Sequence, residues 1–229
     1  MLFGIGADEP RLRHLEGAAM GISRRTAIGR MGAVGSVFLL LPRRALAELS
    51  ATPSAVLGPF YPLTKPAEQD ADLSLLKGHK RAIGQLIEVS GRVLDVNGNA
   101  VSGARIEIWQ ANAAGRYSHP ADDNPAPLDP NFQGYGLLRA DRLGRYRFVS
   151  IKPGGYPAGD DPPRPPHIHV EIQSTRQRRI TQMLFPNEPL NDTDAAIPAD
   201  VRPPLIAQDI GTGGDGAHRY VWDVILNLA

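Results

Sequence analysis

The chain has 229 residues, of which 42% are hydrophobic and 21% charged, and its formal net charge is +1. This is the composition of a globular protein with a sizeable core, and the charge excludes the basic footprint of a nucleic-acid-binding protein or a polybasic membrane patch. The absence of cysteine excludes disulfides, thiolate metal sites and cysteine nucleophiles. The 24 glycines and 21 prolines indicate many turns, which suit short strands better than long helices.

Residues 1–47 are expected to be a targeting segment. Ser23-Arg24-Arg25 precedes a weakly apolar stretch, and Ala45-Leu46-Ala47 forms an Ala-x-Ala processing site. The apolar stretch is too short to span a bilayer, so we expect no stable membrane insertion after signal removal. Paired arginines before such a stretch resemble a bacterial twin-arginine signal, which predicts export to the periplasm or beyond the cell. The stretch before Met20 exceeds what such a signal needs, so Met1 and Met20 are both candidate starts.

Residues 48–84 read as an extended, Pro/Gly-rich N-terminal arm, with a short helix expected around residues 72–77. From Gln85 onward the pattern is strongly β, and residues 85–229 are expected to form one domain. Asn97-Gly98-Asn99 has the residue types of a hairpin turn. The expected strands are residues 86–95, 105–110, 137–140, 146–151, 167–172, 181–185 and 220–228.

Long loops separate several of these strands, at residues 111–135, 152–166 and 186–216. Residues 105–110 alternate charged and apolar side chains, which predicts a half-buried strand with the charges facing outward. Short strands, frequent turns and long loops predict an all-β fold: an antiparallel β-sandwich whose long loops converge on an active site.

Two histidines, His167 and His169, lie two positions apart in a β-prone run. Alternate residues of a strand share one face, so the two imidazoles are expected about 6–7 Å apart along it. Tyr117 and Tyr156 lie in loops rich in glycine and proline, where a phenol is not obviously needed for packing. Two imidazoles and two phenolates would make a hard, anionic site that favours a ferric ion over zinc or copper(I). The sequence therefore predicts an iron-dependent oxygenase.

Several further motifs complete a resemblance to a known family. They are Thr52-Pro-Ser, Gly58-Pro59-Phe60, Gly91-Arg-Val, Ile106-x-Ile-Trp109-Gln110-Ala-Asn112-x-x-Gly115-x-Tyr117, Asp141-x-x-Gly144-x-Tyr146-x-Phe148, Pro153-Gly-x-Tyr156-Pro, Arg164-Pro-Pro-His167-Ile-His169 and Thr181-Gln182-Met-Leu-Phe185-Pro186. Together they resemble the intradiol ring-cleavage dioxygenases, and in particular the catalytic subunits of the protocatechuate branch. Each motif alone is weak, but their order and spacing cover most of the chain after the targeting segment.

The resemblance implies a non-haem Fe(III) held by Tyr117, Tyr156, His167 and His169. It implies that a catecholic aromatic and O₂ are the reactants and that the ring is cleaved between its two hydroxylated carbons, giving a muconate-type diacid. Arg164, Tyr156 and Gln182 are the implied catalytic residues, with Arg164 stabilising charge that develops on the ring. Gly58, Pro59, Tyr61 and Arg164 are the implied substrate contacts. A homo-oligomer is compatible with the sequence.

Other readings of these residues stay open at this point. Tyr146 alternates with Phe148 and is expected in the core. For Tyr61, a role in lining the pocket and a role in packing are equally open. His119, His218 and the acidic residues of the loops, including Asp122, are expected at the surface. The competing function is a secreted, non-catalytic β-sandwich binding module, and a scaffold subunit of a hetero-oligomer is a third reading; the complete set of four ligands argues against both.

Overall fold

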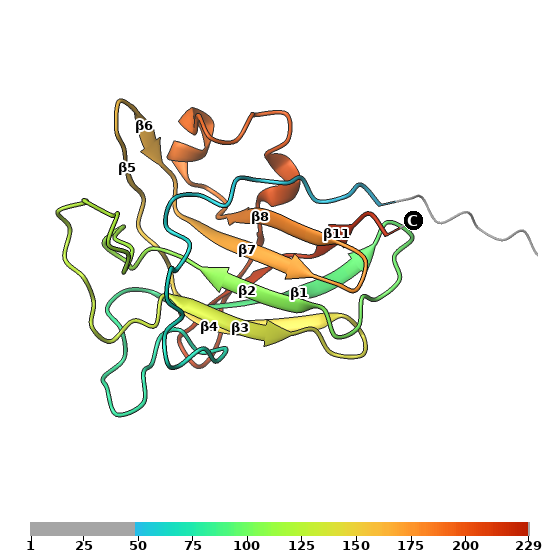
Figure 1. The fold of residues 1–229 in the computed structure, drawn as a ribbon, viewed down its shortest axis with the longest axis horizontal. Coiled ribbons are helices and arrows are strands. Elements are labelled where there is room, and N and C mark those ends of the chain that lie inside the picture. Colours follow the sequence, from blue (N-terminus) through green and yellow to red (C-terminus); the bar gives the residue numbers. More distant parts are fainter. Residues whose placement is uncertain (1–48, 229) are drawn as a thin grey trace, which may run out of the picture. The chain divides into compact units, whose positions relative to one another are not determined.

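Two packed β-sheets form the body of the computed structural model, which describes residues 49–228 (Figure 1). The strands are β1 (Leu86–Asp95), β2 (Arg105–Trp109), β3 (Tyr135–Arg139), β4 (Arg145–Ile151), β5 (Tyr156–Ala158), β6 (Asp161–Arg164), β7 (His167–Gln173), β8 (Arg178–Leu184), β9 (Gln208–Thr212), β10 (His218–Val221) and β11 (Val224–Leu226). Two short 3₁₀ helices, η1 (Pro189–Thr193) and η2 (Pro203–Leu205), follow β8. The predicted all-β sandwich is confirmed.

The sheets differ in how their strands run. β3, β2, β7 and β8 form an antiparallel four-stranded sheet. In the other sheet β4 pairs antiparallel with β1, but β10 and β11 pair in parallel with successive parts of β1. The expectation of a purely antiparallel sandwich is therefore corrected for this sheet, in which the chain's last strands lie beside its first.

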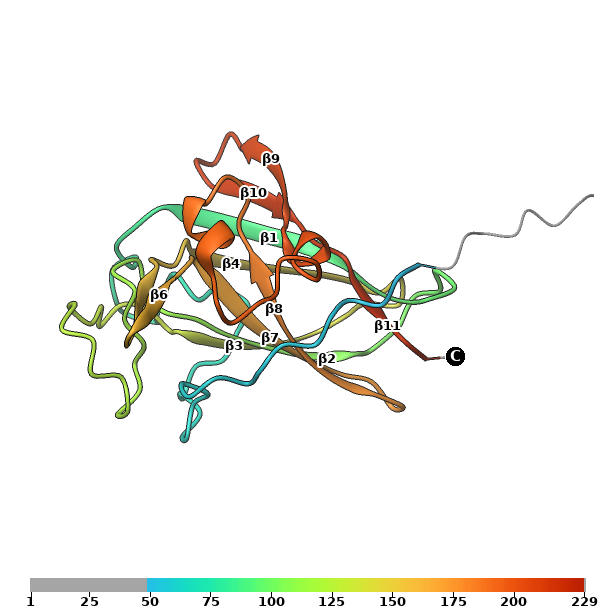
Figure 2. The ribbon, with the colours of Figure 1, turned by 90° about the horizontal axis from the view of Figure 1, so that it is seen from above.

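The main core lies between the two sheets (Figure 2). Alternate residues of β2 and β7, such as Ile106, Ile108, Ile168 and Ile172, point into it and are at most 1% exposed. Tyr146 lies in this core, as expected, and its hydroxyl donates to the Trp222 carbonyl at 2.6 Å. The period of two in the sequence thus fixes which face of each strand meets the other sheet.

A second apolar layer covers the outer face of the four-stranded sheet. Trp109 and Tyr135 are each 1% exposed, and the N-terminal arm packs against them with Leu57, Phe60 and Tyr61. In Figure 1 the arm is the blue-to-cyan segment that crosses this sheet. The expectation that residues 105–110 turn their charges to solvent is wrong, because the arm buries Glu107 to 2% exposure.

The connecting segments also differ from expectation. Residues 72–77 form turns and isolated bridges rather than a helix, with Asp72 bridging to Val149 of β4. The turn at residues 97–99 closes a bridge between Leu94 and Ala100, but β1 and β2 then go to different sheets. The loop at residues 152–166 contains the short hairpin β5–β6.

The predicted targeting segment, residues 1–47, lies outside the described residues. Within the described part of the chain, no helix has the length and apolar character needed to cross a membrane.

Candidate metal centre

A row of side chains across the outer face of the four-stranded sheet positions the site. Register pairs Trp109 of β2 with His169 of β7, and His169 in turn with Gln182 of β8. Trp109 lies flat on the His169 ring, with centroids 4.9 Å apart and an interplanar angle of 9°. Strand pairing and stacking together fix the orientation of one imidazole.

The second imidazole is fixed by a backbone carbonyl. His167 Nδ1 lies 2.7 Å from the Pro165 oxygen, and because a carbonyl only accepts, Nδ1 carries the proton. The lone pair of His167 is then on Nε2, which lies 3.2 Å from His169 Nε2. The predicted histidine pair is thus brought together with its free nitrogens converging.

The two predicted tyrosines join the histidines from separate loops. Tyr156 Oη lies 3.4 Å from His167 Nε2. The Tyr117 ring lies edge-on to that of Tyr156, with centroids 5.6 Å apart. The Tyr117 hydroxyl is buried and has no hydrogen-bond partner among residues 49–228. An unpartnered buried phenol oxygen indicates that something beyond these residues completes the site.

Glycines allow the two tyrosine loops to touch backbone to backbone. A Cβ on Gly115 would lie 2.2 Å from the Gly155 oxygen, and one on Gly154 would lie 2.5 Å from the Ala113 oxygen. Gly154 N–H also donates to the Asn112 carbonyl at 3.0 Å. The loops therefore hold one another, and with them the two phenols.

Asp122 orders the Tyr117 loop from within. Its carboxylate accepts the Tyr117 N–H at 2.6 Å and the Asn124 N–H at 3.0 Å. Asp122 is 8% exposed, so the expectation of a solvated loop charge is wrong.

The two other histidines considered in the sequence, His119 and His218, are only partly exposed. His218 Nε2 lies 2.8 Å from the Asp209 carboxylate.

Burial keeps the four clustered side chains neutral. Burial, with the charge of Arg164, lowers the pKa of His167 to about 3, and burial also lowers the pKa of His169 well below its usual value. Burial raises the pKa of Tyr117 well above its usual value, helped by the neighbouring Tyr156, whose own pKa burial also raises. The cluster thus offers two imidazole lone pairs and two phenols that only a strong local positive charge would ionise.

This donor set fits a hard trivalent cation. Imidazole suits iron, and ionised phenol oxygens suit a high positive charge. Within residues 49–228, no group of three or more His, Cys, Asp and Glu side chains is arranged to hold a metal. The groups beside the histidines that could supply further ligands are therefore the two phenols.

Arg164 stands beside the cluster and is held at both ends of its guanidinium. Its Nη2 donates to Gln182 Oε1 at 2.7 Å, and its Nε lies 2.9 Å from the Asp194 carboxylate. Its side chain is 11% exposed, so the charge is directed by these partners rather than by solvent. The family resemblance predicted Arg164 and Gln182 at this site but not Asp194, which lies in a polar loop like several other acidic residues.

The arm contributes the remaining predicted residues. Gly58 lies against His169, since a Cβ at this position would be 3.0 Å from the imidazole Cε1. Phe60, which the sequence analysis named within a motif but gave no role, has its ring centroid 4.7 Å from that of Tyr117. Pro59 is exposed, and the Tyr61 hydroxyl donates to Glu107 at 2.9 Å. Substrate contact by Gly58, Pro59 and Tyr61 stays a prediction.

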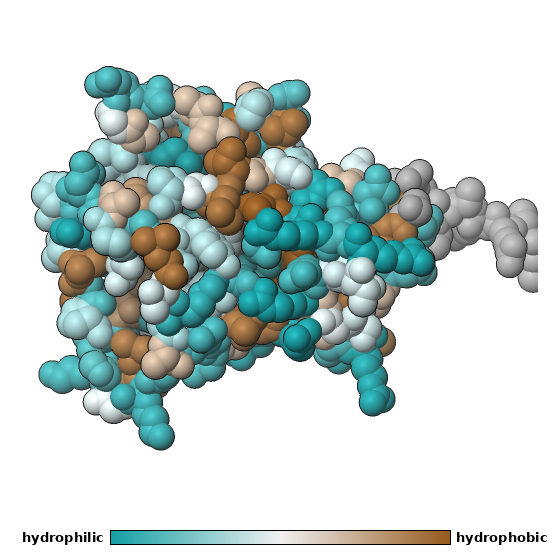
Figure 3. Space-filling view, in the orientation of Figure 1, coloured by the Kyte–Doolittle hydropathy of each residue, from teal (hydrophilic) through white to brown (hydrophobic). Residues whose placement is uncertain are grey.

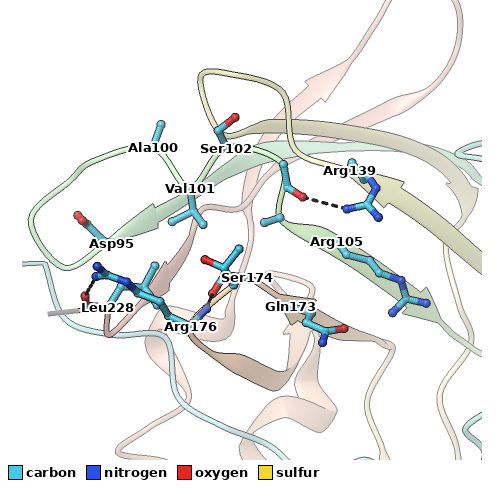
Figure 4. A pocket seen from close by; sticks show the side chains of 13 residues that line it. Asp95, Ala100, Val101, Ser102, Arg105, Arg139, Gln173, Ser174, Arg176 and Leu228 are labelled. Atoms are coloured by element: carbon cyan, nitrogen blue, oxygen red, sulfur yellow. Dashed lines mark hydrogen bonds between the residues drawn. The ribbon is translucent and has the colours of Figure 1, made fainter.

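A cavity of about 270 Å³ adjoins Tyr117, and its walls include Phe60, Lys65, Trp109 and Tyr135. A larger hollow, of about 480 Å³, lies at the other end of β7, where Gln173 and Ser174 line it. Figure 4 shows that the arginine side chains around this larger hollow spread in different directions. It contains none of the clustered donors, so its size does not make it the reaction site.

A family model described as Dioxygenase matches residues 56–227, which cover most of the arm, both sheets and all four clustered side chains. Fold and site thus define an enzyme of the dioxygenase class. The chain belongs to the intradiol ring-cleavage dioxygenase family.

Named relatives agree with this assignment. The chain is 42% identical over 180 residues to the protocatechuate 3,4-dioxygenase beta chain of Burkholderia cepacia, covering 74% of this chain and 73% of that one. It is 33% identical over 159 residues to a hydroxyquinol 1,2-dioxygenase of Rhizobium sp., covering 63% of this chain and 51% of the relative. The chain thus spans only about half of this relative.

Solved structures share the fold. The dioxygenase domain of a carbohydrate-binding fusion protein from Streptomyces sp. SirexAA-E superimposes with a TM-score of 0.62 at 26% identity, over 79% of this chain and 100% of that domain. Hydroxyquinol 1,2-dioxygenase from Pseudomonas putida DLL-E4 gives a TM-score of 0.62 at 25% identity, over 78% of this chain and 67% of that one.

Proposed function

We propose that the protein is a non-haem Fe(III) intradiol dioxygenase that cleaves a catechol-type ring between its two hydroxylated carbons. Both atoms of O₂ enter the product, a muconate-type diacid, so the reaction needs no external reductant. One observation carries the proposal: the Nε2 atoms of His167 and His169 lie 3.2 Å apart, with the buried phenol of Tyr117 and the partly buried phenol of Tyr156 beside them.

Tyr117, Tyr156, His167 and His169 would hold the iron. Ferric iron there would ionise the phenols and accept electron density from the bound diol, which makes the ring reactive towards O₂. The protein's own groups then have distinct tasks.

Tyr156 is the better candidate to take up a substrate proton. It is only partly buried, whereas Tyr117 is 3% exposed, and it begins the short β5–β6 hairpin. A phenolate released there would be a base of suitable strength for a diol proton. Tyr117 and the histidines would remain in place and keep the site closed to bulk water.

Arg164 supplies a fixed positive charge beside the reacting ring. Asp194 and Gln182 hold its guanidinium before substrate arrives, so no reorganisation is needed as charge develops. Gly58 lets the backbone of the arm lie close to His169, because a Cβ at this position would come within 3.0 Å of the imidazole Cε1.

The substrate is proposed as a class, an aromatic ring with two adjacent hydroxyls. The named relatives act on protocatechuate and hydroxyquinol, which both contain this unit. Anaerobic titration with a panel of these diols, followed by oxygen and product analysis, identifies the preferred ring.

The iron-loaded protein is expected to be burgundy, because tyrosinate-to-iron charge transfer absorbs visible light, and to change colour with catechols. Tyr117→Phe should lose the colour and most of the iron. Tyr146→Phe is the matched control, since it removes a buried phenol from the core away from the cluster. A colourless protein that retains iron would contradict the proposed ligands.

We also propose that the enzyme acts outside the cytoplasm. Support comes from Ser23-Arg24-Arg25, the apolar stretch that follows and Ala45-Leu46-Ala47. Fractionation of cells producing the full chain, with an Arg24→Lys/Arg25→Lys variant beside it, tests this. Equal cytoplasmic retention of both forms would refute export by the twin-arginine route.

A further inference from the structure

A buried carboxylate lies two residues before Trp109 on the same face of β2. Glu107 is 2% exposed, and its Oε2 accepts from Lys65 Nζ at 2.5 Å, Tyr135 Oη at 2.6 Å and Tyr61 Oη at 2.9 Å. Its Oε1 pairs with Arg105. A buried charge with so many partners is costly to leave incomplete.

Two of these partners come from the arm. The Lys65 ammonium lies 3.9 Å from the centroid of the Tyr61 ring and 4.2 Å from that of Tyr135, so it is enclosed by cation–π contacts as well as by the ion pair. Its side chain is 31% exposed. Glu107 therefore anchors the arm to the sheet.

Residues 56–68 of the arm depend on side-chain contacts to stay on the sheet. Upstream, Ala55 N–H donates to the Ile180 carbonyl, and downstream the Gln69 carbonyl accepts from Leu137 N–H. Between these two points no backbone–backbone hydrogen bond joins the arm to other described residues. Side chains alone hold residues 56–68 in place.

The same segment touches the metal centre. Gly58 lies against His169, and Phe60 lies against Tyr117. Tyr61 lies edge-on to Trp109, with centroids 5.0 Å apart, and Trp109 stacks on His169. A shift of the arm would therefore reach the imidazole both directly and through the indole.

We propose that Lys65 and Glu107 are positioning residues, whose ion pair fixes residues 58–65 over the site and thereby orients His169. This inference rests on the proposed function, because it treats His169 as a ligand. Neither residue is one of the four clustered donors or hydrogen-bonds to one of them, so each acts through the arm and Trp109.

The test compares Glu107→Gln and Lys65→Met with Glu171→Gln in the purified, iron-loaded protein. Glu171 is the matched control: it is the cross-strand neighbour of Glu107, is 4% exposed, and pairs with Arg178 of β8 rather than with the arm. Three quantities are measured: chymotrypsin cleavage within residues 57–63, the position of the tyrosinate-to-iron absorption band, and kcat with KM.

Both arm variants should be cleaved at least about tenfold faster than the parent and show a shifted absorption band. Their kcat should fall by about 10-fold to 100-fold, as is typical when a residue that orients a metal ligand is lost. The double variant should be no worse than either single one, because both remove the same pair. Glu171→Gln should match the parent in all three measurements.

Equal effects of Glu107→Gln and Glu171→Gln would overturn the proposal, since any buried carboxylate of the sheet would then serve. Cleavage at the parental rate in both arm variants would overturn it as well. If Glu107→Gln does not fold, the three measurements on Lys65→Met test the proposal, because this variant leaves the sheet and the ion pair between Glu107 and Arg105 intact. A parent protein that binds no iron refutes the proposed function, whereas the cleavage assay still reports on the anchor.

Discussion

The backbone contact between the two tyrosine loops leads to a quantitative prediction for Gly115→Ala. Gly115 has φ +77, and its Cβ would lie 2.2 Å from the Gly155 oxygen, where ordinary contact begins at 3.4 Å. The left-handed conformation costs an L-residue about 1–2 kcal/mol. Overlap in a packed region adds about 1–3 kcal/mol. The free energy of unfolding should therefore fall by about 2–5 kcal/mol in total.

The effect on activity follows from the direction of the overlap. Relief requires the loops to separate by about 1.2 Å, the difference between the two contact distances, and this separation moves Tyr156 away from Tyr117. A misplacement of about 1 Å can cost a hundredfold in rate. We expect kcat to fall about a hundredfold, measured by oxygen uptake, and the free energy of unfolding to be read from urea denaturation.

Gly159→Ala is the control. Gly159 has φ +64 and nothing within 4 Å of its Cβ, so it carries the conformational cost without the overlap. Its unfolding free energy should fall by only about 1–2 kcal/mol, with the absorption band unmoved. The reasoning is refuted if the two alanine variants lose stability and activity equally.

Three further outcomes are expected. Arg164→Lys retains the positive charge, but a single ammonium cannot contact Asp194 and Gln182 as the guanidinium does. We therefore expect kcat to fall by about 10²-fold. Iron content, measured by metal analysis, should stay at one per chain. Tyr146→Phe should lower the free energy of unfolding by about 1–3 kcal/mol in urea denaturation, without changing the absorption band. Burial opposes ionisation of Glu107, but its hydrogen bonds, above all from Lys65, outweigh it and lower the pKa from the ordinary 4.5 to about 2. The stabilising effect of the charged carboxylate is therefore complete above pH 4.5 and is lost as pH falls towards 2. Urea denaturation between about pH 5 and pH 3 should show Glu107→Gln losing less stability than the parent.

Local pattern was enough to predict much of the site. The spacing of His167 and His169 places both imidazoles on one face of β7, whereas Arg164 was assigned through the family resemblance. The alternation of Tyr146 with Phe148 likewise predicted their burial in the core.

Contacts between distant segments could not be predicted in this way. Glu107 looks solvent-facing from its alternation, and only the arm, bound through Lys65 42 positions earlier, buries it. Asp194 pairs with Arg164 across a loop whose path no local signal specifies. The parallel pairing of β1 with β10 and β11 was missed for the same reason, because strand partners are chosen by tertiary packing.

That parallel pairing has a consequence for how the protein is made. Arg92 N–H donates to the Asp223 carboxylate, 131 positions later, so the first strand finds this partner only after residue 223 has left the ribosome. Such distant pairing slows folding, and until it forms, one edge of the strand remains available for wrong association. We therefore expect nascent chains that end before β10 to depend on chaperones, and the sheet to be completed only once β10 and β11 have left the ribosome.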